Sequence, residues 1–529
     1  MPESDPARPV DAAPRRPNLV LILADDMGYS DIGCFGAEIA TPNLDRLAAG
    51  GARLTQMYNC ARCCPSRAAL LTGRHPHQAG VGHMVSDYGR PGYQGFLNET
   101  STTIAEALRP AGYRTYMAGK WHVGGTYDLQ RPETWRPGAP GNPLPIQRGF
   151  DRHWGTLAGA GSYFNPPTLV DGDRFVEPEG DQFYYTDAIG RHAGAMAEEG
   201  LASGAPFFLY AAFTAPHWPL HAAPEDIARY EGVYRDGWES LRTARHETAK
   251  GLGLLADRWP ISPPDERAPV WTDLPLERRE WESARMAVYA AQITALDRAI
   301  GRILQPLADA GAMRDTLVIF VSDNGGCAEF LSEDGTDRYR RLTREGRPVR
   351  VGNIQALAPG TPDTFMSYDL PWANASNSPF RLYKHWVHEG GISSPCVVSW
   401  PAAIPAGSVI HDPAHFTDVL PTFLHAAHRP APEGVEGESL LPLLRGERWD
   451  RPRPIFWEHE GNRAVRAGQW KLVSRHPGPW ELYNMEEDRT EGRDLAAGDV
   501  ERVAAMAAQY AEWADRCGVV PWAELRRRR

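Results

Sequence analysis

The chain is organised around one stretch, Cys63-Cys64-Pro65-Ser66-Arg67-Ala68-Ala69-Leu70-Leu71-Thr72-Gly73-Arg74. Pro65 suits the first turn of a helix, because a backbone nitrogen in that turn has no partner inside the helix. The alanine and leucine residues that follow favour a helix, and Gly73 can end it. Cys63 would then lie at the positive end of the helix dipole, where unpaired N–H groups attract anions. With Arg67 nearby, the stretch predicts a reactive thiol at an anion-binding helix end.

The same stretch resembles the signature of the type I sulfatases, C-x-P-S-R-x-x-x-L-T-G-R, and matches every specified position. In that family the cysteine is oxidised after translation to Cα-formylglycine, an aldehyde whose hydrate attacks the sulfur of a sulfate ester. The resemblance implies that a formylglycine-generating enzyme converts Cys63, and that Cys64 fills a variable position. An alternative is a redox or zinc C-x-x-C pair of Cys60 and Cys63. Structural zinc needs four ligands, however, and the chain has no second C-x-x-C.

Length and composition limit the class of protein. The 529 residues suffice for a large catalytic domain and a smaller second domain. A content of 42% hydrophobic and 23% charged residues is typical of a globular protein. The net charge of −11 argues against a nucleic-acid partner, because no basic excess is present to neutralise phosphates. It does not argue against a small anionic substrate in a local basic pocket.

Cysteine usage and hydropathy bear on the compartment. Seven cysteines are few and odd in number, which favours a reducing environment over a disulfide scaffold. The first 16 residues lack the apolar core of a signal peptide, and we expect them to be flexible. The chain has no apolar run long enough for a membrane helix. We therefore expect a cytoplasmic protein without membrane association, whose oligomeric state cannot be read from the sequence.

Four apolar runs with β-branched members predict buried strands of a parallel sheet. Polar side chains that can bind ions or transfer protons follow each run. Alone, such residues could be a solvated turn or a chance surface pair, but four such endings are hard to explain in that way. Ligands of open α/β sheets bind outside the carboxyl ends of the strands, so we expect one shared site. The runs are 18–24, 113–118, 206–213 and 316–321, and they lead to Asp25-Asp26, to Lys120 and His122, to His217, and to Asp323-Asn324.

Further patterns predict the remaining elements. Apolar residues at three- and four-residue steps from Trp281 to about Ala310 predict a long helix that Gly311 ends. Shorter helices are expected at 101–108 and 416–428, and a fifth strand at 395–400. Residues 125–205, rich in Gly, Pro and aromatic residues, and residues 223–280 are predicted as loops that shape the pocket. The segments 465–473 and 480–484 predict antiparallel strands, and 495–514 a closing helix.

The predicted elements and the resemblance agree on one fold class. We expect an α/β fold of the alkaline phosphatase and sulfatase type, with a large, mixed, mostly parallel sheet flanked by helices. Residues 17–435 would form the catalytic domain. Residues 436–529 would form a smaller α+β domain with an antiparallel sheet.

The acidic strand ends predict a metal site. Together they offer only oxygen ligands, which suit a hard divalent cation rather than structural zinc. The resemblance places the same residues around the metal, with the formylglycine derived from Cys63 as a further ligand. Calcium is expected, and magnesium and manganese remain open. The expected oxygen ligands are Asp25, Asp26, Asp323 and Asn324.

The resemblance also implies catalytic roles. Arg67 would stabilise the hydrated aldehyde, and Lys120 and Lys384 would bind the sulfate oxygens. His217 would protonate the leaving group. His122 would take a proton from the second hydroxyl, so that the covalent intermediate eliminates sulfate and the aldehyde returns.

The segment Pro379-Phe380-Arg381-Leu382-Tyr383-Lys384 looks most like bacterial arylsulfatases. We therefore expect a small-molecule aryl sulfate as substrate, with sulfate and a phenol as products. One alternative within the same superfamily is a phosphonate monoester or phosphodiester hydrolase, because phosphate and sulfate esters share a tetrahedral shape. A second alternative is a non-catalytic anion-binding protein that retains the fold.

Overall fold

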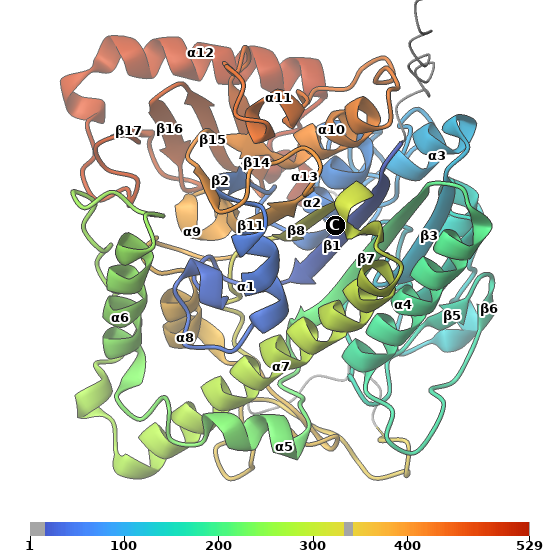
Figure 1. The fold of residues 1–529 in the computed structure, drawn as a ribbon. Helices are drawn as coiled ribbons and strands as arrows, with labels where there is room; N and C mark the ends of the chain where they lie inside the picture. Colours follow the sequence, from blue (N-terminus) through green and yellow to red (C-terminus); the bar gives the residue numbers. More distant parts are fainter. Residues whose placement is uncertain (1–15, 333–341, 528–529) are drawn as a thin grey trace, which may run out of the picture.

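β1 (Asn18–Asp25) lies in the middle of a large sheet that runs through the molecule (Figure 1). The structure, a computed structural model, describes residues 16–332 and 342–527. The segment predicted to be flexible lies, apart from residue 16, outside the described residues. β1 pairs in parallel with β7 (Phe207–Pro216) on one side and with β8 (Thr316–Ser322) on the other, and β3 (Arg114–Gly119) continues the parallel set beyond β7.

Antiparallel pairs lie towards both edges of this sheet. β11 (Ser393–Ser399) runs antiparallel to β8 and to β2 (Ala52–Tyr58). Within the described residues this sheet has 11 strands, in the order β12-β2-β11-β8-β1-β7-β3-β4-β5-β6, with β13 beside β2. This confirms the predicted mixed, mostly parallel sheet. The other strands are β4 (Arg152–Thr156), β5 (Leu169–Asp171), β6 (Arg174–Phe175), β12 (Ser408–Ile410) and β13 (Ala414–His415).

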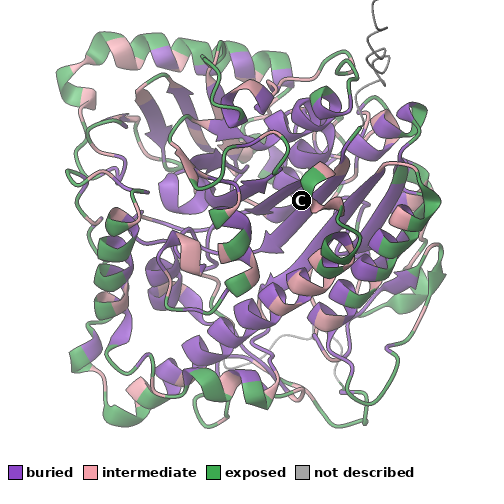
Figure 2. Ribbon diagram, in the orientation of Figure 1, coloured by how far each residue is buried: buried purple, intermediate pink, exposed green. Residues whose placement is uncertain are grey.

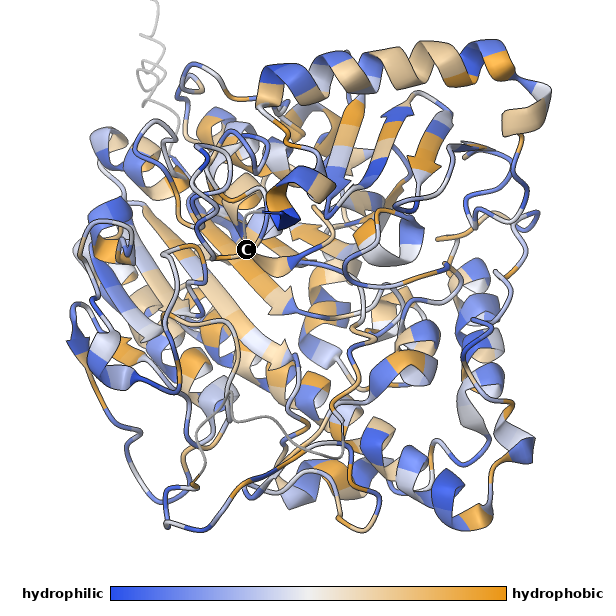
Figure 3. Ribbon diagram, turned by 180° about the vertical axis from the view of Figure 1, so that it is seen from behind, coloured by the Kyte–Doolittle hydropathy of each residue, from blue (hydrophilic) through white to orange (hydrophobic). Residues whose placement is uncertain are grey.

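Helices cover both faces of the sheet, which explains why its central strands are continuous apolar runs. Leu19, Leu21 and Leu23 of β1 pack into one core, and the alternate residues of β1 pack into the other. Figure 2 shows the central strands as buried, and Figure 3 shows them as largely hydrophobic. One face carries α1 (Pro42–Ala49), α4 (Tyr185–Ser203) and α7 (Leu276–Asp309), and the other carries α2 (Cys63–Thr72), α3 (Ile104–Leu108) and α10 (Val419–Ala426).

Two predicted loop regions contain regular structure, so that part of the prediction is wrong. Residues 125–205 include β4, β5, β6 and the 19-residue helix α4. The glycines of α4 are positions of close packing: a Cβ on Gly190 would lie 2.8 Å from the Cβ of Ala299 in α7. Residues 223–280 include α5 (Pro224–Ile227) and α6 (Gly237–Gly251). Between α7 and β11 lie the paired strands β9 (Arg350–Val351) and β10 (Thr364–Phe365), α8 (Asp369–Ser376) and α9 (Glu389–Ile392).

The C-terminal part contains the predicted antiparallel sheet. Its four strands lie in chain order and pack with one face on α12 (Val500–Cys517) and with the other on the catalytic part, around Tyr58 and Ile392. The predicted boundary at residue 436 stays a prediction. The elements are α11 (Leu441–Leu444), β14 (Ile455–His459), β15 (Asn462–Ala467), β16 (Trp470–Ser474), β17 (Glu481–Asn484) and α13 (Trp522–Arg526). Among the described residues, no helix has both the length and the apolar character needed to cross a bilayer.

Candidate active site

The carboxyl ends of four neighbouring strands meet at one edge of the large sheet, in the order β8, β1, β7, β3. β1 ends at Asp25, and Asp323 follows β8 directly. Lys120 follows β3, and His217 follows β7. The structure therefore brings the residues of the four predicted strand ends to one place, as expected for an open α/β sheet.

Helix α2 brings Cys63 to the same edge. It begins at Cys63 after an extended Arg62 and is capped by Gly73, whose φ of 65° is left-handed. Ser66 anchors the first turn, because its hydroxyl oxygen accepts the backbone N–H of Cys60 at 2.9 Å. The helix is buried along its whole length, and Cys63 itself is 1% exposed. The predicted thiol at a helix N-terminus is thus present and shielded from water.

Arg67 ties three strands together beneath Cys63. Its Nε donates to Asp323 Oδ2 at 2.9 Å, and one terminal nitrogen donates to the Lys120 carbonyl at 2.9 Å. The other terminal nitrogen lies 2.8 Å from Asp323 Oδ2 and 3.5 Å from Asp25 Oδ2. The planar guanidinium suits such a task, because it presents several donors in fixed directions. All of these side chains are fully buried.

Two lysines balance the adjacent carboxylates that follow the apolar run of β1. Lys120 Nζ donates to Asp25 Oδ2, and Lys384 Nζ donates to Asp26 Oδ2 at 2.9 Å. His217 Nε2 lies 3.4 Å from both Lys384 Nζ and Asp26 Oδ2. Its Nδ1 lies 2.6 Å from the carbonyl oxygen of Trp218 and therefore carries the proton. The Nε2 lone pair of His217 is thus directed into the site.

Oxygen atoms in this cluster fit a hard cation. Asn324 Nδ2 donates to Asp26 Oδ1 at 2.7 Å. Asp25 Oδ1 and Asn324 Oδ1, although buried, have no hydrogen-bond partner among the described residues. Possible ligand atoms of Asp25, Cys63 and Asp323 lie within 4.8 Å of one another. Unpartnered buried acceptors require an explanation, and a cation that prefers oxygen ligands supplies one.

The electrostatics of the site point in the same direction. Burial and the negative charge of Asp25 raise the pKa of Asp323 well above its ordinary value, in spite of Arg67 and Lys120. Burial alone would raise the pKa of Asp25 too, but Lys120, His217 and Arg67 lower it. The pKa of one carboxylate is raised and that of the other is lowered, because the two compete for the same positive groups. An added cation would relieve that competition.

The thiol of Cys63 is strongly activated. A hydrogen bond from Cys64 is the largest effect that lowers its pKa well below the ordinary value. Burial opposes this shift, and Lys384, Lys120 and a hydrogen bond with His122 support it. A lowered thiol pKa favours the thiolate form of Cys63 beside these cationic groups. All seven cysteines are free in the structure, Cys60 and Cys63 among them, and the alternative of a redox or zinc pair of these two residues stays a prediction.

His122 completes the group around residue 63. Burial, and then the charge of Lys120, lower the pKa of His122 to about 4, so the imidazole is neutral at pH 7. His122 has a left-handed φ of 54°, an uncommon conformation for a residue with a side chain. Gly159 packs against the ring, because a Cβ there would lie 2.2 Å from His122 Cε1. The loop of Gly159 therefore positions the His122 ring.

Two residues beside the site were not predicted from the sequence. Tyr163 holds the loop of His217, because its hydroxyl donates to the carbonyls of Thr214 and His217 at 2.9 and 2.7 Å. Glu329 lies 2.9 Å from Arg62 and accepts the indole N–H of Trp218 at 3.0 Å. Neither Tyr163 nor Glu329 ends a predicted strand or belongs to a recognised motif, so no local signal marks them.

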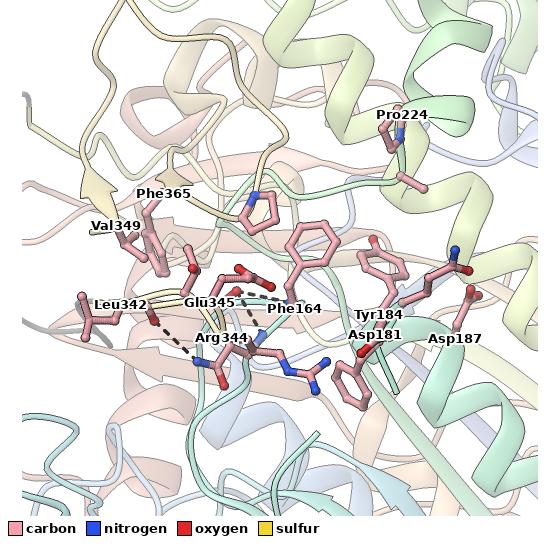
Figure 4. A pocket seen from close by; sticks show the side chains of 18 of the residues that line it. Phe164, Asp181, Tyr184, Asp187, Pro224, Leu342, Arg344, Glu345, Val349 and Phe365 are labelled. Atoms are coloured by element: carbon pink, nitrogen blue, oxygen red, sulfur yellow. Dashed lines mark hydrogen bonds between the residues drawn. The ribbon is translucent and has the colours of Figure 1, made fainter. Parts of the chain in front are cut away.

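A cavity of about 420 Å³ lies next to the His217 loop. Figure 4 shows Phe164, Tyr184 and Phe365 around it, with Arg344 at one side. Phe365 connects the cavity with the site, since its ring packs edge-on against Trp218 with 5.9 Å between centroids. The cavity therefore offers aromatic surface within two ring contacts of His217.

Comparisons with known proteins agree with this arrangement. A family model described as Sulfatase matches residues 17–429, and one described as N-sulphoglucosamine sulphohydrolase, C-terminal, matches residues 380–511. The chain is 34% identical over 451 residues to an arylsulfatase of Klebsiella aerogenes, covering 82% of this chain and 91% of that protein. It is 32% identical over 524 residues to an uncharacterized sulfatase of Schizosaccharomyces pombe, covering 92% and 91%.

Other relatives of this chain are sulfatases named for other substrates. The steryl-sulfatase of Mus musculus is 31% identical over 503 residues, covering 88% of this chain and 71% of that protein. Among solved structures, Ps i-CgsB is similar with a TM-score of 0.67 and 26% identity, over 94% of this chain and 93% of that chain. The similarity therefore extends over both the large sheet and the C-terminal sheet.

Proposed function

The chain belongs to the sulfatase family and hydrolyses sulfate esters, and from this premise we propose that its substrates are aryl sulfates, which yield inorganic sulfate and a phenol. The similarity to an arylsulfatase over 82% of the chain supports an aryl group. The aromatic cavity that adjoins Trp218 supports it independently. The relatives named above are sulfatases, so a phosphonate monoester or phosphodiester hydrolase is not favoured.

The observation that carries the proposed mechanism is the meeting of four strand ends with the N-terminus of α2. We propose that Cys63 is converted to Cα-formylglycine, whose hydrate supplies a hydroxyl nucleophile for the sulfur atom. Burial of Cys63 at 1% exposure supports this assignment, because a shielded site protects the reactive group from side reactions. The small and odd number of cysteines, seven, supports the further proposal that the protein works in a reducing compartment, the cytoplasm.

The acidic strand ends would hold one divalent cation, and we propose calcium. Asp25, Asp26, Asp323 and Asn324 supply the oxygen donors, two of which lack a partner within the described residues. When bound, the cation would act as a Lewis acid that neutralises negative charge on the sulfate group. Magnesium and manganese accept the same donors, so metal analysis of the purified protein decides among the three.

The remaining side chains would bind and move protons. Lys120 and Lys384 would contact the sulfate oxygens and stabilise charge in the transition state. Arg67, fixed by Asp323, would orient the side chain at position 63. Once its ring carries hydrogens on both nitrogens, His217 would deliver the Nε2 proton to the leaving oxygen, and Asp26 Oδ2, 3.4 Å away, would stabilise this protonated form. His122, neutral at pH 7, can accept a proton from the side chain at position 63.

One experiment tests the nucleophile and the substrate together. The protein is co-expressed with a formylglycine-generating enzyme, assayed on 4-nitrophenyl sulfate and on bis(4-nitrophenyl) phosphate, and digested with trypsin. The peptide of residues 63–67 should weigh about 18 Da less than the unmodified peptide, the difference between thiol and aldehyde side chains. Activity on the sulfate should rise with the modified fraction, and Cys63→Ala should be inactive. Full activity of the unmodified protein, or faster phosphodiester hydrolysis, would contradict the proposal.

A further inference from the structure

A second group of ligand-type side chains lies beside the active site and has no part in the proposed mechanism. His459 ends β14, Glu460 follows it in the turn to β15, and His385 follows Lys384. Ligand atoms of these three residues lie within 4.8 Å of one another. His385 Nδ1 is 3.3 Å from Glu460 Oε2, and His459 Nε2 is 3.7 Å from Glu460 Oε1. Two imidazoles thus converge on one carboxylate.

His459 is not explained by ordinary hydrogen bonding. Its side chain is 0% exposed, and neither ring nitrogen has a hydrogen-bond partner among the described residues. Buried polar groups in native structures nearly always have a partner, so this histidine requires one. The backbone around it is unusual as well, since His385 and Glu460 have left-handed φ values of 89° and 52°. Such conformations in residues with side chains cost energy and gather at functional sites.

A third histidine orients the carboxylate. His83 Nε2 lies 2.7 Å from Glu460 Oε1. The His83 ring stacks between Trp522 and His459, with 5.0 and 5.5 Å between ring centroids. This arrangement resembles the outer contacts of metal sites, in which a hydrogen-bonded partner fixes the direction of a ligating group.

We propose that His385, His459 and Glu460 bind a transition-metal ion, zinc being the best match, at a site separate from the oxygen-lined cation site. Two imidazoles and one carboxylate are a known donor set for zinc, with a water as the fourth ligand. The catalytic cluster offers carboxylate and amide oxygens, whereas this cluster offers mainly nitrogen, so the two sites select different cations.

The ion would connect the two parts of the molecule. Glu460 and His459 belong to the C-terminal sheet, whereas His385 directly follows Lys384 in the catalytic part. The His385 backbone N–H donates to the Ala61 carbonyl at 2.7 Å, two residues before Cys63. A metal at this position would therefore hold the loop of Lys384 against the C-terminal sheet.

The neighbour of His385 allows a specific test. Asn462 Nδ2 lies 3.3 Å from His385 Nε2 and donates at 3.0 Å to the His459 carbonyl. In this arrangement Nε2 accepts and Nδ1 carries the proton. A metal ion bound to Nδ1 of His385 would require the ring proton to lie on Nε2. There the proton would face the N–H group of the Asn462 amide, which disfavours this form of the ring. A carboxylate at position 462 would accept the Nε2 proton of His385, so Asn462→Asp should strengthen metal binding. A cluster with only a structural role would show no such gain in metal binding.

The experiment is a Co²⁺ titration of the full chain in a Cys63→Ala background, which removes the active-site thiolate, with saturating Ca²⁺ for the oxygen-lined site. We expect one equivalent of Co²⁺ with the strong visible absorption of a four-coordinate nitrogen and oxygen site, and displacement by Zn²⁺. His385→Gln and Glu460→Gln should abolish this band. His83→Gln should weaken binding about 10–100-fold, the usual effect of an outer-shell change. Asn462→Asp should tighten it.

A control is His425→Gln, which changes an exposed histidine of helix α10 whose Nδ1 lies 2.9 Å from the Ser439 hydroxyl, and which should leave the titration unchanged. Circular dichroism shows whether each variant is folded. The test uses variants of His385 and Glu460, which are partly exposed, because a substitution of the buried His459 could unfold the protein. Absence of the band in the parent protein would overturn the proposal. A band that is unchanged in both His385→Gln and Glu460→Gln would overturn it equally, leaving a hydrogen-bonded imidazole–carboxylate cluster only.

Discussion

At the scale of single residues, Arg67 shows how much a buried side chain of the sequence motif contributes to the stability of the fold. Its guanidinium satisfies Asp323 and the Lys120 carbonyl and lies close to Asp25. Arg67→Ala leaves the carboxylate of Asp323 buried without its partner, which typically costs about 3–5 kcal/mol of unfolding free energy. Urea denaturation of the purified proteins measures this loss.

The same motif contains a control for that prediction. Arg74 is more exposed and donates from one terminal nitrogen to the Glu433 carbonyl at 2.7 Å. Arg74→Ala should therefore change the unfolding free energy by roughly 0.5 kcal/mol or less. Equal losses for the two variants would show that the buried network around Arg67 does not carry the stability assigned to it.

Gly159 supports a prediction about the position of His122. A methyl group at residue 159 would overlap the imidazole, whose Cε1 lies 2.2 Å from the ideal Cβ position. Gly159→Ala should displace the ring and lower kcat about 100-fold, the lower end of what a positioned acid or base contributes, with little change in KM. Steady-state kinetics on 4-nitrophenyl sulfate measures both. Gly251→Ala, where an added Cβ meets no atom within 4 Å, should leave kcat unchanged. A kcat of Gly159→Ala equal to that of the parent would contradict this role for Gly159.

At the scale of elements, α4 shows why a glycine-rich stretch can be a helix. Gly190 and Gly194 face α7, and a Cβ at either position would lie within 3 Å of it. Figure 1 shows the two helices side by side on one face of the sheet. The helix was predicted as a loop because glycine disfavours helices locally, whereas close packing against α7 favours it in the folded chain.

The contact between α4 and α7 predicts a stability effect. Gly190→Val would insert a branched side chain against Ala299 and should lower the unfolding free energy by about 1–3 kcal/mol, as overpacked cores do. Arg191→Val, on the exposed side of the same helix, controls for the change in helix propensity. Thermal unfolding followed by circular dichroism compares the two. If Arg191→Val destabilises the protein as much as Gly190→Val, tight packing between the helices is not the cause.

At the scale of the whole molecule, a buried ion network joins the catalytic part to the C-terminal sheet. Glu389 Oε1 lies 2.8 Å from Lys471 Nζ, and Glu389 Oε2 lies 2.9 Å from Arg489 Nε. Lys471 also lies 2.8 Å from Glu491. Burial alone would raise the pKa of Glu389, but Lys471, Arg489 and Arg466 outweigh it and lower the pKa to about 2.

This shift makes stability depend on pH. Because the ordinary pKa of 4.5 is higher than the folded value of about 2, the unfolded chain binds a proton in this range that the folded protein does not. The stabilisation is fully present above about pH 4.5 and is lost as the pH falls towards 2, and it is on the order of 3 kcal/mol. Urea unfolding of the parent and of Glu389→Gln between pH 3 and 6 tests this. The variant should be less stable at pH 6 and should show a flatter pH dependence, and parallel curves would contradict the assignment.

What the sequence by itself determined is local. The helix from Cys63, the strands that end at Asp25, Lys120, His217 and Asp323, and the long helix α7 follow from apolar runs, helix periodicity and terminal residues, all of which act over a few neighbours. Because parallel strands end at one edge of a sheet, these local features also predicted that the candidate site residues would meet. The resemblance to the sulfatases, based on the motif, supplied the expected chemistry.

Only the tertiary structure decided the rest. In it the region of α4 is a helix, and residues 52–58 form the strand β2. In β2, Thr55 and Gln56 interrupt the apolar pattern, but both form hydrogen bonds with His411. It placed Glu329 and Tyr163 beside the site, and it joined His385 to His459 and Glu460 across more than 70 residues. The physical reason is that packing of helix on helix and partners for buried polar groups come from residues distant in the chain, and no local pattern records them.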